Sequence, residues 1–279
     1  MKYIFDSVSY QCSKVVTKNY STSFSLATKM LSKSIRQDIY NIYGFVRFAD
    51  EIVDSFHDYK KEDLFNKFVY DLELALDDRI SLNPILNSFQ VTFHKYKIDK
   101  AHVDAFMRSM RMDLYKSKYL TDEKFKSYIY GSADVVGLMC LKVFVKGDQA
   151  KFETLVDGAM ALGSAFQKVN FLRDIKSDHE LLNRSYFPNT NLKALDEQAK
   201  QDIIDDIESD FIKGLQGIKQ LPMEARFGVF MAYRYYRQLL KKLKRTPALE
   251  INNARIRVPN YKKVELLTRS YVKYQLNLL

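Results

Sequence analysis

Apolar residues recur every three or four positions along most of the chain, and this spacing predicts α-helices almost throughout. The pattern is clearest over residues 34–56, whose apolar positions are Ile35, Ile39, Ile42, Phe45, Val46, Ala49, Ile52 and Val53. Similar patterns predict helices over residues 64–76, 99–115, 121–145, 152–175, 195–215, 222–243 and 261–278. We expect Asp99 to cap one of them and breaks to fall at residues 81–84, 147–148 and 185–191.

Turn-forming residues are scarce, with 9 Gly and 5 Pro in 279 residues. Sandwiches of β-sheets and doubly wound α/β folds need many tight turns, so this scarcity favours long helices. No internal repeat, low-complexity tract or linker interrupts the pattern. The sequence therefore predicts an all-α fold, organised as one helical-bundle domain over residues 1–279, with about eight to eleven helices.

Composition excludes several other classes. A hydrophobic fraction of 47% is too high for a disordered chain, and two cysteines, Cys12 and Cys140, cannot build a disulfide scaffold or a four-cysteine zinc site. The longest apolar stretch, residues 135–145, contains Lys142 and is shorter than the roughly 18 residues of a membrane span. Asp6 stands where a signal peptide would be apolar. We therefore expect a cytoplasmic protein.

The charge balance is basic, with 44 Lys and Arg against 34 Asp and Glu, a formal net charge of +10. Such a balance suits nucleic acid, anionic lipid or a phosphorylated substrate, and composition leaves these open. Because the basic residues are spread along the chain, we expect no nucleic-acid partner. The basic run 241–245 ends a predicted helix, where cations suit the helix dipole; peripheral contact with a membrane surface is the alternative.

One polar stripe lies within the apolar stretch 34–56. At about 100° per residue, Tyr43, Arg47, Asp50 and Asp54 fall within an arc of about 60° on one helix face. Two carboxylates on one face repel each other, so a purely structural helix gains nothing from this pair. A cation bridging Asp50 and Asp54 would offset the repulsion, because Mg²⁺ prefers oxygen ligands.

A second polar stripe lies in the stretch 152–175 and just beyond it. Gln167, Asn170, Asp174 and Asp178 share an arc of about 80°, and Arg173 lies beside them. Facing each other across a bundle, the two stripes would hold several Mg²⁺ ions, with Mn²⁺ as the alternative ion, and through them a diphosphate. The two arginines suit bidentate contacts to phosphate oxygens.

A solvated helix face is the competing interpretation of each stripe. The acidic stretch 202–210 has similar spacing, but Lys200, Gln201 and Lys213 surround it, and we expect it to lie on the surface. The two stripes differ because each lies within an apolar helix and has an arginine beside it. Gly131, Gly137 and Gly163 leave two interpretations open, room for long apolar ligands or plain helix packing.

Both stripes resemble motifs of the squalene/phytoene synthase family. The first motif is Tyr43-x-x-x-Arg47-x-x-Asp50-Glu51-Ile52-Val53-Asp54. The second is Gln167-x-x-Asn170-x-x-Arg173-Asp174-x-x-x-Asp178, followed by Arg184-x-Tyr186-x-Pro188. Weaker matches are Ser21-Thr22-Ser23-Phe24, Met112-Asp113, Tyr128-x-x-Gly131, Ala232-x-x-x-Tyr236 and Arg255-x-Arg257. The resemblance extends from about Ser21 to the C-terminal region.

This resemblance implies a head-to-head prenyl transferase of the isoprenoid synthase fold. The metal group it implies comprises Asp50, Asp54, Asn170, Asp174 and Asp178. The implied contacts to prenyl diphosphate are Tyr20, Ser21, Thr22, Ser23, Tyr43, Arg47, Gln167, Arg173 and Tyr236, and Asp113 matches an acidic position of the family's pocket. Some members carry a basic residue in the early segment, whereas this chain has Tyr20-Ser21-Thr22-Ser23. Glu51 stands where Asp is commoner, and we expect it to turn away from the metals.

The expected reaction is the condensation of two geranylgeranyl diphosphates to phytoene. The paired motifs without a C-terminal membrane helix favour it, and the lack of a nicotinamide fingerprint disfavours reductive squalene formation. A squalene or dehydrosqualene synthase that uses farnesyl diphosphate is the alternative. A non-catalytic assembly factor is a rival of another class, against which the intact metal carboxylates argue. Oligomeric state is not predicted.

Overall fold

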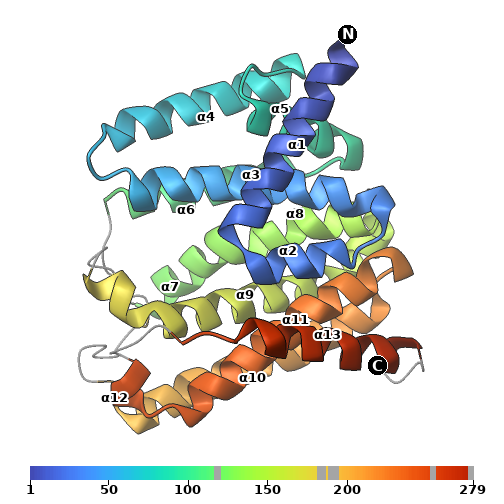
Figure 1. Ribbon diagram of the computed structural model, residues 1–279. Helices are drawn as coiled ribbons and strands as arrows, with labels where there is room; N and C mark the ends of the chain where they lie inside the picture. The colour runs from blue at the N-terminus through green and yellow to red at the C-terminus, as the bar shows by residue number, and fades with distance from the viewer. Residues whose placement is uncertain (116–120, 181–186, 188–194, 252–255, 276–279) are drawn as a thin grey trace.

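The computed structural model describes residues 1–115, 121–180, 187, 195–251 and 256–275, and these residues form helices and no strands (Figure 1). The helices of the first half are α1 (Lys2–Tyr20), α2 (Thr22–Lys29), α3 (Lys33–Ser55), α4 (Lys61–Asp78), α5 (Pro84–Tyr96), α6 (Lys100–Asp113) and α7 (Asp122–Ile129). A π-helical turn, η1 (Tyr130–Asp134), leads to α8 (Val135–Phe144) and α9 (Gln149–Glu180). The remaining helices are α10 (Glu197–Gln220), α11 (Met223–Arg245), α12 (Ala248–Ile251) and α13 (Asn260–Gln275). The predicted all-α fold is confirmed.

Local signals in the sequence set several of the helix boundaries. The Asp99 side chain accepts a hydrogen bond from the backbone N–H of Ala101 at 2.9 Å, so the predicted cap of α6 is confirmed. Asn83 caps α5 in the same way, and Pro84 occupies the first turn, where a missing N–H costs nothing. Thr121 caps α7. These helices therefore begin where polar side chains satisfy the first free amides.

The predicted number of helices was too low, since the described residues contain thirteen α-helices and a π-helical turn. The stretch 121–145, predicted as one helix, is divided into α7, η1 and α8. A π turn inserts one residue into the helical repeat, and this local change leaves the three- and four-residue apolar spacing almost intact. Helices as short as α2 and α12 have too few residues to show a period.

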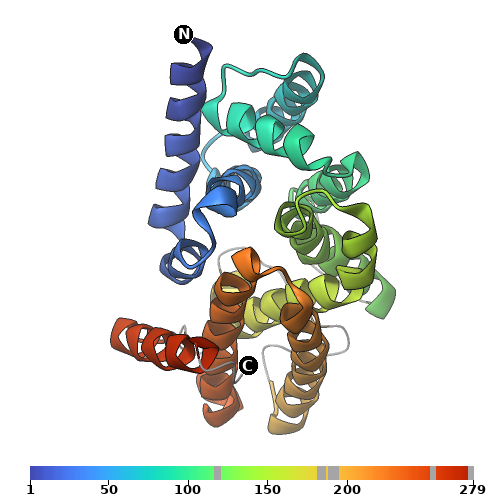
Figure 2. The same cartoon turned by 90° about the vertical axis from the view of Figure 1, so that its right-hand side faces the viewer.

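Two large apolar clusters and a smaller one stabilise the fold. In the first, Phe45 of α3 stacks on Phe89 of α5 with ring centroids 4.0 Å apart, and Phe106 of α6 meets it edge-on at 5.5 Å. The second cluster joins α9, α10 and α11 and is centred on residues such as Val169 and Phe211. Helix α8 packs against both α3 and α9, which lie in separate layers (Figures 1 and 2). This arrangement holds the two predicted motif helices apart on either side of a shared space.

The structure bears on two expectations, one about the cysteines and one about membrane spans. Cys12 and Cys140 are free thiols. In the described part of the chain, no helix combines the length and the apolar character that crossing a bilayer requires.

Candidate active site

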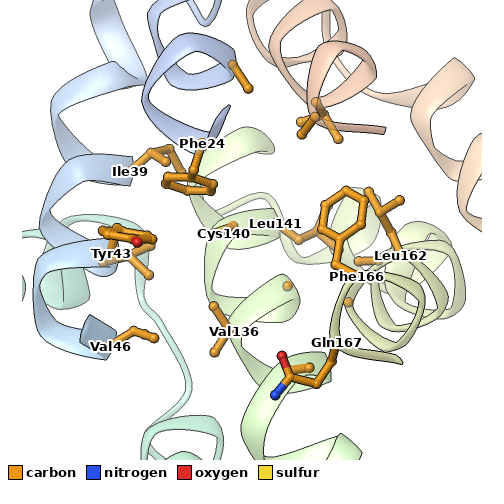
Figure 3. Close-up of a pocket in the computed structure, with 18 of the residues that line it drawn as sticks. Phe24, Ile39, Tyr43, Val46, Val136, Cys140, Leu141, Leu162, Phe166 and Gln167 are labelled. Atoms are coloured by element: carbon orange, nitrogen blue, oxygen red, sulfur yellow. The ribbon is translucent and has the colours of Figure 1, made fainter. Parts of the chain in front are cut away.

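A cavity of about 490 Å³ lies between the layers and is lined mainly by α2, α3, α8, α9, α10 and α11, with further residues from α1, α6, α7 and η1. Its walls are mostly apolar. In Figure 3, Phe24, Ile39, Tyr43 and Val46 face Leu162, Phe166 and Gln167, with Val136, Cys140 and Leu141 between the two groups. Such a lining suits a long hydrocarbon that is kept from water.

Both predicted polar stripes reach this one cavity. The predicted residues that line it are Tyr20, Ser21, Tyr43, Arg47, Asp50, Gln167, Asn170, Arg173 and Tyr236. Helices α3 and α9 run in the same direction, as the colour change along each shows in Figure 1. The stripes lie in the C-terminal halves of both helices, so the polar groups gather toward one end of the cavity.

On α3, a single guanidinium holds two acidic side chains. Arg47 donates through Nη1 to Asp50 and through Nη2 to Glu51. Burial lowers the pKa of Arg47, but the two carboxylates outweigh this effect and raise the pKa above its ordinary value. Its Nε is buried and has no hydrogen-bond partner among the described residues. The guanidinium also lies 4.5 Å from the centre of the Tyr20 ring. Arg47 therefore stays charged and keeps one donor available at the cavity.

Tyr43 forms the wall next to Arg47. Its ring stacks on Phe24 at a centroid distance of 4.6 Å. Burial raises the pKa of Tyr43 to about 12, although the nearby positive charge of Arg47 opposes the shift. The phenol is thus neutral at physiological pH and can donate a hydrogen bond.

On α9, the arginine pairs with the adjacent aspartate. Arg173 Nε donates to Asp174 Oδ1 at 2.9 Å, and Nη2 makes a second bond to Oδ2. Asn170 Oδ1 accepts a hydrogen bond of 3.4 Å from the hydroxyl of Tyr236 on α11. The Tyr236 ring in turn stacks on Phe166 at 4.0 Å. A third helix therefore contributes to orienting this motif.

Other predicted residues lie next to the cavity without lining it, namely Thr22, Ser23, Asp54, Asp113 and Asp174. Asp113 is buried and accepts a hydrogen bond of 2.7 Å from the hydroxyl of Tyr128, which does line the cavity. Asp178 lies in the last turns of α9, and its side chain is outside the described part of the structure. Arg184, Tyr186, Pro188 and Arg255 of the resembling motifs also lie outside the described residues.

The donor set fits a hard divalent cation in its chemistry. Asp50 and Asp54 on α3, with Asn170 and Asp174 on α9, offer oxygen ligands at steps of four residues. Within the described residues, no three acidic, histidine or cysteine side chains converge closely enough to hold a metal by themselves. Mg²⁺ commonly takes only one or two carboxylates and completes its shell with water and substrate phosphate. These residues could therefore hold Mg²⁺ together with a bound diphosphate.

The structure adds residues to the site that the sequence did not single out. Glu51, which we expected to turn away from the metals, binds the same guanidinium as Asp50 and so belongs to the motif. Ser132, in the π turn η1, lines the cavity with an Oγ that is buried and has no partner among the described residues. The i, i+4 spacing of Arg47 and Glu51 was a usable signal. Ser132 directly follows Gly131 of a family-like motif, which was the available signal.

One expectation about the surface was wrong in part. Asp202, Asp205 and Asp206 are exposed, but the Asp210 side chain is only 16% exposed and binds Lys168 of α9 at 2.8 Å. Burial raises the pKa of Asp210, while Lys168 opposes the shift. The acidic stretch 202–210 therefore turns one carboxylate inward, because α10 packs along the length of α9.

Gly137 and Gly163 fit both interpretations given above, room for a ligand and close helix packing. Gly137 and Gly163 line the cavity. A Cβ at Gly137 would lie 2.9 Å from the carbonyl oxygen of Ala159, and one at Gly163 would lie 2.8 Å from that of Ala133. Gly131 does not line the cavity and instead packs against Ser109. Close helix packing and the cavity wall thus share the same small residues.

Comparison with known proteins shows which family has this all-α fold and this cavity with two polar motifs. The sequence matches the squalene/phytoene synthase family over residues 17–262, and the chain belongs to this family. The predicted family is therefore confirmed.

Individual relatives agree with this assignment. The chain is 28% identical to phytoene synthase 3, chloroplastic, of Zea mays, over 95% of this chain and 65% of the relative. It is 27% identical to phytoene synthase, chloroplastic, of Narcissus pseudonarcissus, over 97% of this chain and 67% of the relative. The chain thus spans about two thirds of the length of these relatives.

Solved structures show the same fold. A dehydrosqualene synthase in complex with a ligand superposes with a TM-score of 0.82 at 20% identity, covering 97% of this chain and 98% of that one. Squalene synthase HpnC from Alicyclobacillus acidocaldarius gives a TM-score of 0.75 at 19% identity, over 87% of this chain and 95% of the other.

Proposed function

We propose that this protein is a Mg²⁺-dependent prenyl transferase that condenses two geranylgeranyl diphosphates head to head and forms phytoene. The observation that carries the proposal is the meeting of both polar motifs at one end of a single apolar cavity. The apolar walls would enclose the prenyl chains, and the polar end would take the diphosphates.

The proposed metal ligands are Asp50 and Asp54 on α3 and Asn170, Asp174 and Asp178 on α9. Bound Mg²⁺ would neutralise the charge that develops on the departing diphosphate. Arg47 and Arg173 would contribute to the same task, since their guanidinium groups offer paired donors to phosphate oxygens. Tyr43, held neutral by burial, would donate a hydrogen bond at this end of the cavity.

In the proposed reaction, the C–O bond of one substrate breaks and releases diphosphate and an allylic cation. The double bond of the second substrate attacks this cation, and loss of a proton closes a cyclopropyl diphosphate. A second loss of diphosphate, rearrangement and loss of a proton give the C40 hydrocarbon. The apolar walls exclude water from these cations, and aromatic faces such as those of Phe24 and Phe166 stabilise them by roughly 0.5–2 kcal/mol each.

The cavity is long enough for the longer substrate. Leu155 and Arg173 both line it from α9. Eighteen residues separate them, which corresponds to about 27 Å of helix. This wall is longer than an extended prenyl chain of twenty carbons. The plant phytoene synthases among the relatives support the same choice, whereas the dehydrosqualene and squalene synthases among the structural neighbours favour the shorter farnesyl diphosphate as the second candidate.

Product analysis tests the proposal. The purified protein, Mg²⁺ and detergent are incubated with farnesyl or geranylgeranyl diphosphate, with and without NADPH, and hydrocarbons are identified by gas chromatography–mass spectrometry. A C40 product from geranylgeranyl diphosphate alone supports the proposal. A C30 product assigns the second candidate, and its dependence on NADPH separates squalene from dehydrosqualene. No turnover of either substrate by folded protein would favour the non-catalytic rival.

A further inference from the structure

Helix α1 packs with small polar residues inward. Its fully buried positions are Ser9, Ser13 and Thr17. Ser9 Oγ accepts a hydrogen bond of 3.1 Å from the side chain of Asn87 on α5. The hydroxyls of Ser13 and Ser88 are hydrogen-bonded at 2.6 Å. Most helices at a protein surface instead bury apolar side chains and leave polar ones in water, so this order is reversed at the buried positions of α1.

The opposite face of α1 carries an exposed apolar stripe, formed by Ile4, Val8 and Val15. These residues are 49%, 51% and 56% exposed. At about 100° per residue they fall within an arc of about 40°, whose centre is about 160° from that of the buried polar residues. Helix α1 packs on α2, α3 and α5 and lies at the outside of the fold (Figures 1 and 2). Single exposed apolar residues are ordinary, but an aligned set indicates a contact surface.

The charges beside this stripe are positive. Lys14 and Lys18 are exposed and lie about 100° and 60° from the centre of the stripe. Helix α1 has three lysines and one acidic residue, Asp6, which pairs with Lys2 at 2.7 Å. An apolar stripe with lysines beside it is typical of helices that lie in a membrane interface. There the apolar groups enter the boundary of the acyl chains and the lysines reach anionic headgroups.

Helix α4 shows why exposed apolar residues alone are not sufficient. Tyr70 and Leu74 are also exposed on it. However, α4 carries six acidic residues and two lysines, so its surface is negative. Anionic lipid would repel α4 and attract α1. Charge also argues against a second copy of the chain on α1, because paired α1 helices would bring their lysines together.

The basic run 241–245, considered above for membrane contact, is less suited to it. Lys242 donates to a backbone carbonyl at 2.9 Å, and Lys244 pairs with Glu208 at 3.4 Å. Leu243 is fully buried, so this run offers no apolar side chain to a bilayer. Helix α1 combines both features that the run lacks, free lysine stems and an apolar stripe.

We propose that the outer face of α1 is the surface through which this protein docks on an anionic lipid membrane, with the helix lying parallel to the membrane plane. The stripe would enter the acyl boundary, and Lys14 and Lys18 would contact the headgroups. Helix α1 ends at Tyr20, which lines the cavity, so a docked protein would hold the polar end of the cavity near the lipid surface. The inference goes beyond the proposed function and does not depend on it.

Vesicle binding, measured by co-sedimentation of the full chain, tests the apolar stripe without turnover. One set of vesicles contains equal parts of phosphatidylcholine and phosphatidylglycerol, and the other contains phosphatidylcholine alone. Val8→Gln with Val15→Gln removes most of the stripe, and glutamine is a good helix former. We expect affinity for the anionic vesicles to fall by about tenfold, since each valine loses apolar burial. Tyr70→Gln with Leu74→Gln on α4 is the matched control and should bind as the wild type does.

A second pair of variants tests the charge. We expect Lys14→Gln with Lys18→Gln to lower the affinity for anionic vesicles by about tenfold or more and to leave binding to phosphatidylcholine unchanged. Added salt should diminish this difference, because it screens the lysines from the headgroups. Lys241→Gln with Lys244→Gln changes the net charge equally and is the matched control.

Weaker binding of both α1 variants, with unchanged binding of both controls, supports the inference. The inference is wrong if the wild type does not bind anionic vesicles, or if either α1 variant, folded by circular dichroism, binds them as the wild type does. A greater loss in the control at residues 241 and 244 would place the contact at that run instead. A wild-type dimer that the stripe variant dissociates in analytical ultracentrifugation would show that a second copy covers α1. Vesicle binding and product analysis are separate readouts, so failure of one leaves the other conclusion standing.

Discussion

Helices α3 and α9 carry related motifs to the same cavity, but their charges are balanced differently. On α3, three carboxylates, Asp50, Glu51 and Asp54, accompany one guanidinium, Arg47. On α9, two carboxylates, Asp174 and Asp178, accompany the guanidinium of Arg173 and the neutral amide of Asn170. The α3 side is thus the more negative of the two. We infer that it holds cations more strongly, whereas the α9 side adds neutral oxygen ligands and phosphate donors.

The largest expected effect comes from removing one carboxylate on each side. Asp50→Asn and Asp174→Asn should each lower kcat by about 10²- to 10³-fold, because each removes charge that would hold Mg²⁺ on the leaving group. The charge difference predicts that Asp50→Asn also raises the Mg²⁺ concentration for half-maximal rate more than Asp174→Asn does. Steady-state kinetics across a Mg²⁺ titration measure both effects.

Asp202→Asn on the exposed face of α10 is the matched control and should be neutral. Circular dichroism of each variant checks that the fold is retained. Wild-type activity in either motif variant would show that the residue is not part of the metal site. An equal rise in the Mg²⁺ concentration for half-maximal rate in both variants would show that the α3 side does not hold cations more strongly than the α9 side.

Helix α9 has a second polar face outside its motif. On it, Ser164 donates a 2.7 Å hydrogen bond to buried Asp134, and Lys168 binds Asp206 at 2.5 Å and Asp210 at 2.8 Å. Burial raises the pKa of Asp134 from 3.8 to about 6, and the negative charge of Asp210 adds to this shift, against Ser164 and Lys168. The folded state therefore binds more protons at this group than the unfolded state does between these two values.

Because the folded state binds more protons, the contribution of Asp134 to the free energy of unfolding falls as pH rises from about 4 to about 6. Asp134→Asn should raise the free energy of unfolding by about 1–3 kcal/mol at neutral pH, with the gain vanishing near pH 4. The amide oxygen can still accept from Ser164. Urea unfolding at several pH values measures the difference. A variant that is less stable than the wild type at neutral pH would show that Asp134 is needed as a charged partner in this network.

Glu51 offers a smaller test on the α3 side. Glu51→Gln removes the charge that binds Nη2 of Arg47 and leaves the guanidinium less firmly oriented toward the cavity. We expect KM for the prenyl diphosphate to rise by about fivefold to tenfold, the usual size of a charged hydrogen-bond loss at a partly exposed site. Glu73→Gln, an exposed partner of Lys100, is the control. A change in kcat alone would instead place Glu51 among the groups that act on the leaving diphosphate.

The two motifs could be predicted from the sequence, but the contacts between neighbouring helices around them could not. Asp50 and Asp54, or Asn170 and Asp174, share a helix face by their spacing alone, so the helical period places them. The pairing of Lys168 with Asp210 depends on how α9 and α10 pack, and no local pattern records it. Lys263 and Thr22 lie 241 residues apart, so their contact follows only from the docking of α13. The helix count failed at the π turn η1, where a one-residue change leaves the apolar spacing almost intact.

The smallest expected effect comes from Tyr236, which reaches the α9 motif from α11. Tyr236→Phe removes the hydroxyl that donates to Asn170 and keeps the ring that stacks on Phe166. Because this hydrogen bond is long, at 3.4 Å, we expect the loss in kcat/KM to be only about twofold to threefold. Tyr233→Phe, on the same helix, is the control. A loss above about tenfold would mean that the Tyr236 hydroxyl contacts the diphosphate itself, since orientation of one neutral amide contributes less than that. The α9 side of the cavity would then contact the substrate directly, as the α3 side does. The two helices would differ only in how strongly they hold the metal ions.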